Sequence, residues 1–233
     1  MARSPLVDRL RASAPQISVG VLTADWLTLG SQLEILESAG VELLHFDVMD
    51  GMFCPMLTMG APVVAGLKTR LLKDVHLMIE DPLSKLDAFV AAGADIITVH
   101  AESTRHIHRV LQALGKMTNA NDSNRGIVRG IALNPGTPLE VLEPLAGEFE
   151  LVLMLAVNPG WGGQKFIAST CDRVKRLREI VRDTALICVD GGVTRDNIGS
   201  IARLGADIIV TGSAVFDGKA PLENARVMTG ALR

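Results

Sequence analysis

The chain has 233 residues, 48% of them hydrophobic, and carries a formal net charge of -3. This charge balance argues against nucleic acid as a partner. Three cysteines (Cys54, Cys171 and Cys188) are too few and too unevenly spaced for a disulfide framework, which favours a cytoplasmic location. No run approaches the roughly 18 apolar residues of a membrane span. The first residues lack the apolar stretch of a signal peptide.

Short apolar runs alternate with amphipathic stretches along the whole chain. Residues 1–15 are expected to form a short helical or frayed extension ahead of the first strand. The apolar runs predict eight strands, at Ile17–Leu22, Leu43–Asp47, Lys73–His76, Ile96–His100, Val128–Leu133, Leu151–Ala156, Ala185–Val189 and Ile208–Thr211. Helical periodicity predicts helices over Trp26–Ser38, Pro82–Ala92, Thr104–Leu114, Ala168–Arg182 and Asn197–Leu204. Apolar strands followed by helices indicate a parallel sheet covered on both faces.

Three segments repeat one pattern, a helix-ending glycine followed by a buried strand: AGVELLHFD (Ala39–Asp47), AGADIITVH (Ala92–His100) and LGADIIVTG (Leu204–Gly212). Eight strands at about 28 residues per unit match a (β/α)8 TIM barrel of roughly 250 residues. We therefore predict one α/β domain, a single (β/α)8 barrel over residues 1–233. An open doubly wound sheet is the alternative, but the first strand lacks a glycine-rich dinucleotide turn, so no nucleotide cofactor is expected. The polar stretch Lys116–Arg125 predicts a mobile loop.

Four polar side chains end apolar strands, at the face where barrels carry their active sites. His45 and Asp47 lie two apart in LLHFDVMDG, so along a strand they share one face. His76 in DVHLM and Asp190 in CVDGG end strands of their own. Burying such groups without partners costs several kcal/mol, and one divalent metal ion would satisfy them. Two imidazoles and two carboxylates suit Zn²⁺, Fe²⁺, Mn²⁺ or Co²⁺ without selecting among them.

Three glycine-bearing turns follow the later strands: NPGWGGQKF (Asn158–Phe166), DGGV (Asp190–Val193) and TGSAVF (Thr211–Phe216). Glycine lets backbone N–H groups approach an anion closely, and a helix N-terminus adds a favourable dipole. Phosphate sites in barrels commonly lie after the seventh and eighth strands, where the last two turns fall. The turns therefore predict phosphate-binding loops after the last strands and a phosphorylated substrate.

With these motifs the chain resembles the ribulose-phosphate 3-epimerase family over nearly its whole length. The matching segments are LHFDVMDG, DVHLMIEDP, AGADIITVHAE, ALNPGTPLE, VNPGWGGQKF and VDGGV. The resemblance implies a metal-dependent isomerase that epimerises a ketose phosphate at C3, most typically D-ribulose 5-phosphate to D-xylulose 5-phosphate in the pentose phosphate pathway. It also implies a homo-oligomer.

The resemblance carries roles onto individual positions. The family's metal ligands match His45, Asp47, His76 and Asp190. Its two catalytic acid/base groups match Asp47 and Asp190, and Met49 and Met78 match members of its apolar cover over the metal. Its substrate and phosphate contacts match His76, Gly160, Trp161, Gly162, Gly163, Asp190, Gly191, Gly192, Val193, Gly212 and Ser213. His100, in TVHAE, is expected to be a structural or supporting residue.

The chemistry of inversion fits two carboxylates on different strands. Removing the proton beside a ketone creates an enediolate, whose charge a divalent ion stabilises as a Lewis acid. Inversion then needs one group on each side of the carbon, one ionised and one protonated. Asp47 and Asp190 suit these roles, and the sequence leaves open which acts on which epimer.

Several positions depart from the family pattern: Gly20 stands for a usual serine, Met52, Cys54 and Met56 alter the segment after the metal strand, and Leu155 and Ala156 precede NPG. These changes thin the polar substrate contacts, so another ketose phosphate, such as a hexulose 6-phosphate or a tetrulose phosphate, is an alternative substrate. A non-catalytic sugar-phosphate-binding protein is a further alternative, against which the two retained aspartates argue. A decarboxylase or aldol-type synthase would carry lysine where Val48 stands.

Apolar residues also gather in the presumed loop after the second strand: Met52, Phe53, Met56, Leu57 and Met59. Such a group suits either a subunit contact or a loop folded over the barrel mouth, and the sequence leaves both open.

Overall fold

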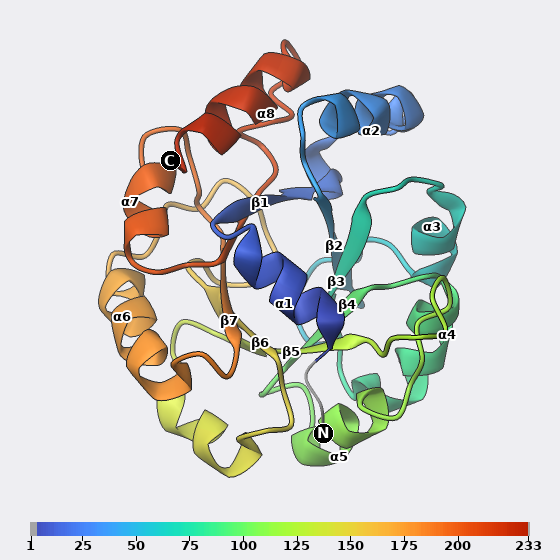
Figure 1. Cartoon of the computed structure of the whole chain (residues 1–233), viewed down its shortest axis with the longest axis vertical. Helices are drawn as coiled ribbons and strands as arrows, with labels where there is room; N and C mark the ends of the chain where they lie inside the picture. The colour runs from blue at the N-terminus through green and yellow to red at the C-terminus, as the bar shows by residue number, and fades with distance from the viewer. Residues whose placement is uncertain (1–3, 233) are drawn as a thin grey trace.

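The apolar runs of the sequence form eight parallel strands that close into a ring in chain order (Figure 1). The computed structural model describes residues 4–232. The strands are β1 (Gln16–Gly20), β2 (Leu43–Met49), β3 (Leu72–Met78), β4 (Ile96–His100), β5 (Val128–Leu133), β6 (Leu151–Leu155), β7 (Leu186–Asp190) and β8 (Ile208–Thr211). The predicted (β/α)8 barrel is therefore confirmed. Strand β1 ends earlier than predicted, because the chain turns at Val21 into a short 3-10 helix.

Helices surround the ring in Figure 1. They are α2 (Leu29–Ser38), α3 (Ala61–Gly66), α4 (Leu86–Ala91), α5 (Ile107–Leu114), α6 (Thr170–Val181), α7 (Ile198–Arg203) and α8 (Pro221–Gly230), with 3-10 helices η1 (Val21–Thr23), η2 (Pro82–Lys85) and η3 (Leu139–Leu145). Each predicted helix is present, and all but one begin later than expected. The exception begins at Pro82 as predicted, as η2, and continues as α4. None of the helices described between residues 4 and 232 combines the length and apolar character that a membrane crossing needs.

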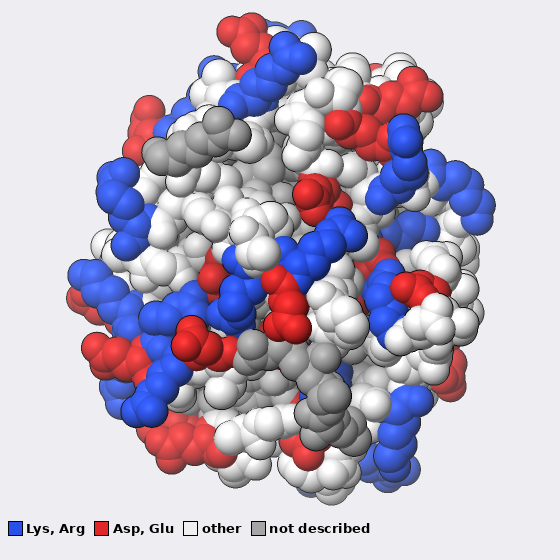
Figure 2. All heavy atoms as spheres, viewed as in Figure 1, with Lys and Arg blue, Asp and Glu red and all other residues white. Residues whose placement is uncertain are grey.

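Helix α1 (Pro5–Ala12) lies across the N-terminal end of the ring (Figure 1). Its apolar residues Leu6, Val7 and Leu10 are buried against inward side chains at the strand starts, such as Leu43 and Ile96. Each such side chain contributes roughly 1.5–3 kcal/mol when fully buried. Basic and acidic side chains are interspersed over this face of the molecule (Figure 2). Within its described part the expected extension is thus helical over Pro5–Ala12, and this helix closes the barrel end opposite the predicted site. Residues 1–3 of the predicted extension lie outside the described residues.

The three repeated segments of the sequence form the same joint between a helix and the next strand. In each, a glycine follows the helix with a positive φ, 77° at Gly40, 86° at Gly93 and 93° at Gly205. Glycine adopts this conformation at little cost, which ends the helix and turns the chain into the strand. The repeat seen in the sequence is therefore a repeat of structure.

An acidic residue directly before β4, β6 and β8 ties each of these strands to the preceding one. The backbone N–H of the acidic residue donates to the carbonyl of one residue in the preceding strand. The carboxylate of the acidic residue accepts a hydrogen bond from the backbone N–H of that partner residue. The three pairs are Asp95 with Lys73 (2.9 and 2.7 Å), Glu150 with Arg129 (2.8 and 3.0 Å) and Asp207 with Ile187 (2.8 and 2.7 Å). Each strand start is thus held by a backbone and a side-chain hydrogen bond together.

The polar stretch over residues 116–125 is anchored to the joint that precedes β4. Asn119 is buried, and its Nδ2 donates to the carbonyl of Ala94 (2.9 Å) and to Asp95 Oδ1 (3.1 Å). Arg125 forms an ion pair with the same carboxylate. The stretch is thus a loop, as predicted, and two of its polar side chains complete the joint before β4.

Gly130 on β5 leaves room for the buried Thr98 on β4, since a Cβ at position 130 would lie 2.1 Å from Thr98 Oγ1. We expect Gly130→Ala to lower the free energy of unfolding by about 1–3 kcal/mol, because a filled core resists added atoms. Denaturant unfolding measures this change. The control is Gly30→Ala on α2, where no described atom lies within 4 Å of the added Cβ. Equal loss in both variants would contradict the packing argument.

Candidate active site

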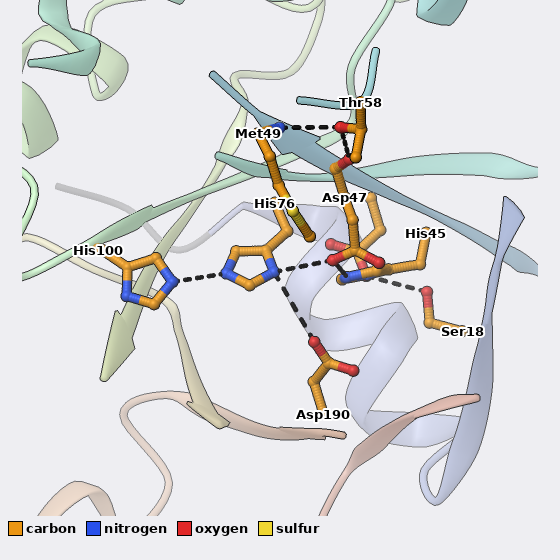
Figure 3. Close-up of polar contacts among 9 residues, drawn as sticks. Ser18, His45, Asp47, Met49, Thr58, His76, His100 and Asp190 are labelled. Atoms are coloured by element: carbon orange, nitrogen blue, oxygen red, sulfur yellow. Dashed lines mark hydrogen bonds and ion pairs between the residues drawn. The ribbon is translucent and has the colours of Figure 1, made fainter. Parts of the chain in front are cut away.

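The register of β2 and β3 places polar side chains side by side, with His45 opposite Asp74 and Asp47 opposite His76. Alternation along each strand turns them into the barrel. Asp190 ends β7, and Figure 3 shows its carboxylate pointing toward Asp47 and His76. One ligand atom from each of His45, Asp47, His76 and Asp190 lies within 4.8 Å of the others. The structure thus brings together the four side chains that the sequence predicts as metal ligands.

The geometry of this cluster fits one divalent ion. Asp47 Oδ1 lies 3.3 Å from both His45 Nε2 and His76 Nδ1, and Asp190 Oδ2 lies 3.8 Å from His76 Nδ1. Among the described residues, the buried Nε2 of His45 makes no well-formed hydrogen bond, although Asp47 Oδ1 lies 3.3 Å away. A buried nitrogen without a good hydrogen bond is costly, and an ion bound by these nitrogen and oxygen donors would satisfy it.

Asp74 and Ser18, which the sequence analysis did not identify, support His45 on the side of its ring that faces away from the cluster. Its Nδ1 lies 2.7 Å from Asp74 Oδ2, and Ser18 Oγ donates to the same oxygen at 2.9 Å. A carboxylate at Nδ1 keeps the ring proton there and leaves Nε2 facing the cluster. The available signal was Asp74 itself, a charge within an apolar strand and two residues before His76, hence on the same face.

The protonation states of the two central carboxylates are driven apart. Burial and the neighbouring Asp47 carboxylate raise the pKa of Asp190 to about 6. Burial acts the same way on Asp47, but His45 and His76 outweigh it and hold its pKa well below the usual range. Burial opposes a charge on His45, yet the Asp74 and Asp47 carboxylates raise its pKa well above normal. Without metal, Asp47 is therefore the ionised carboxylate and Asp190 the one that holds a proton most readily.

This difference predicts how the stability of the metal-free protein changes with pH. The pKa of Asp190 is about 6 in the folded protein, against 3.8 for an ordinary aspartate. The folded state is therefore favoured while Asp190 is protonated at low pH, and the free energy of unfolding falls as Asp190 ionises with rising pH. Asp190→Asn cannot ionise, so the variant should not lose stability in this way. We expect the variant to gain stability over the parent between pH 4 and 7, on the order of 2 kcal/mol. Denaturant unfolding across this range tests it; a difference independent of pH would contradict it.

His76 has a partner on its other ring nitrogen. Its Nε2 lies 2.9 Å from Nε2 of His100, whose Nδ1 lies 3.0 Å from Glu102 Oε2. Burial lowers the pKa of His100 to about 4. Burial raises the pKa of Glu102, but hydrogen bonds from His100, Thr137 and Asn134 outweigh it and lower this pKa to about 2. A neutral imidazole therefore lies between His76 and a carboxylate, and the sequence offered no signal for Glu102.

A pocket of about 780 Å³ opens over the cluster. It is lined by ten of the eleven predicted substrate and phosphate positions, Gly160, Trp161, Gly162, Gly163, Asp190, Gly191, Gly192, Val193, Gly212 and Ser213. The eleventh, His76, is fully buried beneath Asp47 and does not reach the lining. Met49 and Met78, the predicted apolar cover, line the pocket beside Asp47.

The positions that depart from the family pattern divide into two groups. Gly20, Met56 and Leu155 line the pocket. Met52, Cys54 and Ala156 are not among the lining residues. An argument for an unusual substrate therefore rests on the first group.

The loop after β6 is held in place by its own side chains and by the next turn. Gln164 Oε1 accepts the N–H of Asn158 (3.0 Å), and Nε2 donates to the carbonyls of Asn158 (2.6 Å) and Trp161 (3.0 Å). A Cβ on Gly192 would lie 2.5 Å from the backbone nitrogen of Phe166. The close contact requires glycine there, and the two glycine turns form one wall of the pocket.

Comparison with known proteins agrees with this geometry. The model of the ribulose-phosphate 3-epimerase family matches residues 16–216. A ribulose-phosphate 3-epimerase of Bacillus subtilis is 39% identical over 207 residues, which is 86% of this chain and 92% of that protein. A chloroplastic ribulose-5-phosphate-3-epimerase of Arabidopsis thaliana is 41% identical over 223 residues, covering 93% of this chain and 76% of that protein.

Solved structures match the fold as well. The crystal structure of 3-hexulose-6-phosphate synthase from Salmonella typhimurium aligns with a TM-score of 0.65 over 93% of this chain and 98% of its own. Its sequence is 18% identical, so this likeness concerns the barrel alone.

Proposed function

This chain belongs to the ribulose-phosphate 3-epimerase family, as its motifs predict, and we propose that it interconverts D-ribulose 5-phosphate and D-xylulose 5-phosphate. It is a sugar-phosphate epimerase. The observation that carries the mechanism is the pair of carboxylates, Asp47 and Asp190, that face one pocket from strands that are not neighbours in the ring.

In the proposed reaction an ionised carboxylate takes the proton from C3, and the protonated carboxyl returns one to the opposite side of the carbon. The strands that carry Asp47 and Asp190, β2 and β7, are not neighbours in the ring, which suits approach from two sides. A divalent ion held by both aspartates, His45 and His76 would supply the positive charge that stabilises the enediolate. Met49 and Met78 line the pocket, where their apolar side chains would limit the access of water to the reacting carbon.

The phosphate group binds, in this proposal, to the turns after β7 and β8. Gly191, Gly192, Gly212 and Ser213 line the pocket there, so backbone N–H groups and one hydroxyl can reach its oxygens. The close packing of Gly192 against Phe166, which holds the turn after β7 beside the loop after β6, supports this assignment.

A second candidate substrate, another ketose phosphate, is favoured by Gly20, Met56 and Leu155 in the pocket lining. A screen of solvent-deuterium exchange at C3 over pentulose, hexulose and tetrulose phosphates separates the two. We expect the highest kcat/KM for D-ribulose 5-phosphate. A much higher kcat/KM for a different ketose phosphate would show that sugar to be the substrate, and membership of the family would still stand.

We also propose a homo-oligomer located in the cytoplasm. Support comes from large apolar side chains exposed in the loop after β2, 78% for Leu57 and 74% for Met52. Light scattering at micromolar concentration tests the assembly, and a clean monomer mass of 24.9 kDa would overturn it. Cell fractionation tests the location, with recovery in the membrane or secreted fraction as the contrary result.

A further inference from the structure

The two histidines of the cluster face it with different ring nitrogens, His45 with Nε2 and His76 with Nδ1. A neutral imidazole binds a metal ion through the nitrogen that carries no proton. His45 must therefore keep its proton on Nδ1, where the Asp74 carboxylate accepts it at 2.7 Å. His76 needs the opposite tautomer, with its proton on Nε2.

The groups behind the ring favour that tautomer, against the Asp47 carboxylate, whose Oδ1 lies 3.3 Å from Nδ1 and would accept a proton there while no ion is bound. A proton on Nε2 of this buried ring requires an acceptor, and His100 Nε2 lies 2.9 Å away (Figure 3). His100 Nε2 can accept only if the proton of that ring is on Nδ1, which lies 3.0 Å from Glu102 Oε2. An ionised carboxylate has no proton to donate, so Glu102 fixes the direction of both hydrogen bonds.

Glu102 is itself held firmly from the loop after β5. Its Oε1 accepts the backbone N–H of Asn134 at 2.9 Å and a hydrogen bond from the Thr137 hydroxyl. Arg173 on α6 braces this loop, because its Nη2 donates to the carbonyl of Thr137 at 2.7 Å. Glu102, which sets the direction of the hydrogen bonds from His76 through His100, is therefore held in place by groups outside the barrel interior.

We propose that Glu102 and His100 are positioning residues that lock His76 in the tautomer whose bare Nδ1 faces the cluster. The inference rests on the metal site of the proposed function. The two histidines would then be set in opposite tautomers by two separate carboxylates, Asp74 on one side and Glu102 on the other. In the ion-bound site each ring would then present a bare nitrogen to the ion.

Nitrogen-15 NMR of the imidazoles in the metal-free protein, at a pH where His76 is neutral, tests the lock directly. We expect the Nε2–H tautomer for His76 in the parent protein. In His100→Phe the ring volume is kept but the acceptor is lost, and Nδ1 of His76 can donate to Asp47 Oδ1 at 3.3 Å. The variant should therefore shift toward the Nδ1–H tautomer. An unchanged tautomer in this variant would overturn the proposal.

Affinity for Co²⁺ provides the second measurement, by competition with a chromogenic chelator and by the cobalt absorption spectrum. We expect His100→Phe and Glu102→Gln to weaken binding roughly 10–100-fold, as loss of a partner behind a metal-bound histidine does. Glu140→Gln is the matched control, because it removes an exposed carboxylate paired with Arg176. Thermal melts of each metal-free variant verify folding, and Glu102→Gln serves if His100→Phe does not fold.

The outcomes separate this inference from the proposed function. Parent-like Co²⁺ affinity and spectrum in both variants would overturn the positioning role while the metal site stands. A parent protein that binds no Co²⁺ would refute the metal site, and the tautomer measurement would still decide whether Glu102 and His100 set the ring of His76.

Discussion

Replacing Asp47 or Asp190 with asparagine is expected to lower kcat for epimerisation by roughly 10²–10⁴-fold, because an amide neither takes nor returns the C3 proton. Asparagine matches aspartate in size, so the barrel should keep its fold. Both side chains face the same pocket, and both lie in the cluster with His45 and His76. Steady-state rates with purified variants, loaded with the same metal, measure the loss.

The two variants also distinguish a two-base mechanism from a single shared base. With one carboxylate intact, deuterium from solvent should enter C3 of one epimer without conversion to the other, and the two variants should differ in which epimer exchanges. Asp172→Asn is the matched control, since that side chain is 89% exposed on α6. Substantial epimerisation by both purified variants would refute the assignment.

Removing divalent metal with a chelator is expected to abolish measurable turnover, and one equivalent of divalent ion should restore it. The reason is the loss of the charge that stabilises the enediolate, a contribution of several kcal/mol. Loading should also release protons, because the Asp74 and Asp47 carboxylates raise the pKa of His45 above normal in spite of its burial. Calorimetry in buffers of different ionisation enthalpy measures this release.

A ligand variant sharpens the test. His45→Gln should weaken metal affinity by more than the roughly 10–100-fold that loss of a supporting partner costs. His108→Gln is the control, because His108 is half exposed and pairs with Glu148 outside the cluster. Full activity in protein shown by elemental analysis to be free of metal would contradict the prediction.

The parts of the fold that the sequence predicted are those with a strong local pattern. Buried strands such as β4 and β5 are mostly apolar, with Thr98 and His100 the polar residues of β4 and Arg129 that of β5, and their bounds agree with the prediction. Helix starts agree less well, because the turns before Leu29 and Ile107 are stabilised by local side-chain hydrogen bonds that do not alter apolar periodicity. The short η3 contains Pro144, which interrupts any helical pattern.

The candidate site shows the same division. His45, Asp47, His76 and Asp190 stand out in the sequence because each is polar at the end of an apolar run. Of their supporting residues, Asp74 and His100 are visible as polar residues within apolar strands, but the partner that each one meets depends on register, which no local pattern encodes. Asp74 meets His45 through strand pairing, and Glu102 reaches His76 through His100, in a different strand.

The carboxylates that precede β4, β6 and β8 bear on how the ring avoids slipped strands. A shift of one residue in a parallel pair turns every side chain of that strand to the other face. Such a slip between β3 and β4 would also part the Asp95 carboxylate from the N–H of Lys73 and leave both groups buried without their partner. The two residues of each hydrogen-bonded pair, Asp95 with Lys73, Glu150 with Arg129 and Asp207 with Ile187, are 22, 21 and 20 residues apart in the chain. Misaligned pairings are thus penalised within short segments of chain, before the ring has to close between its first and last strands.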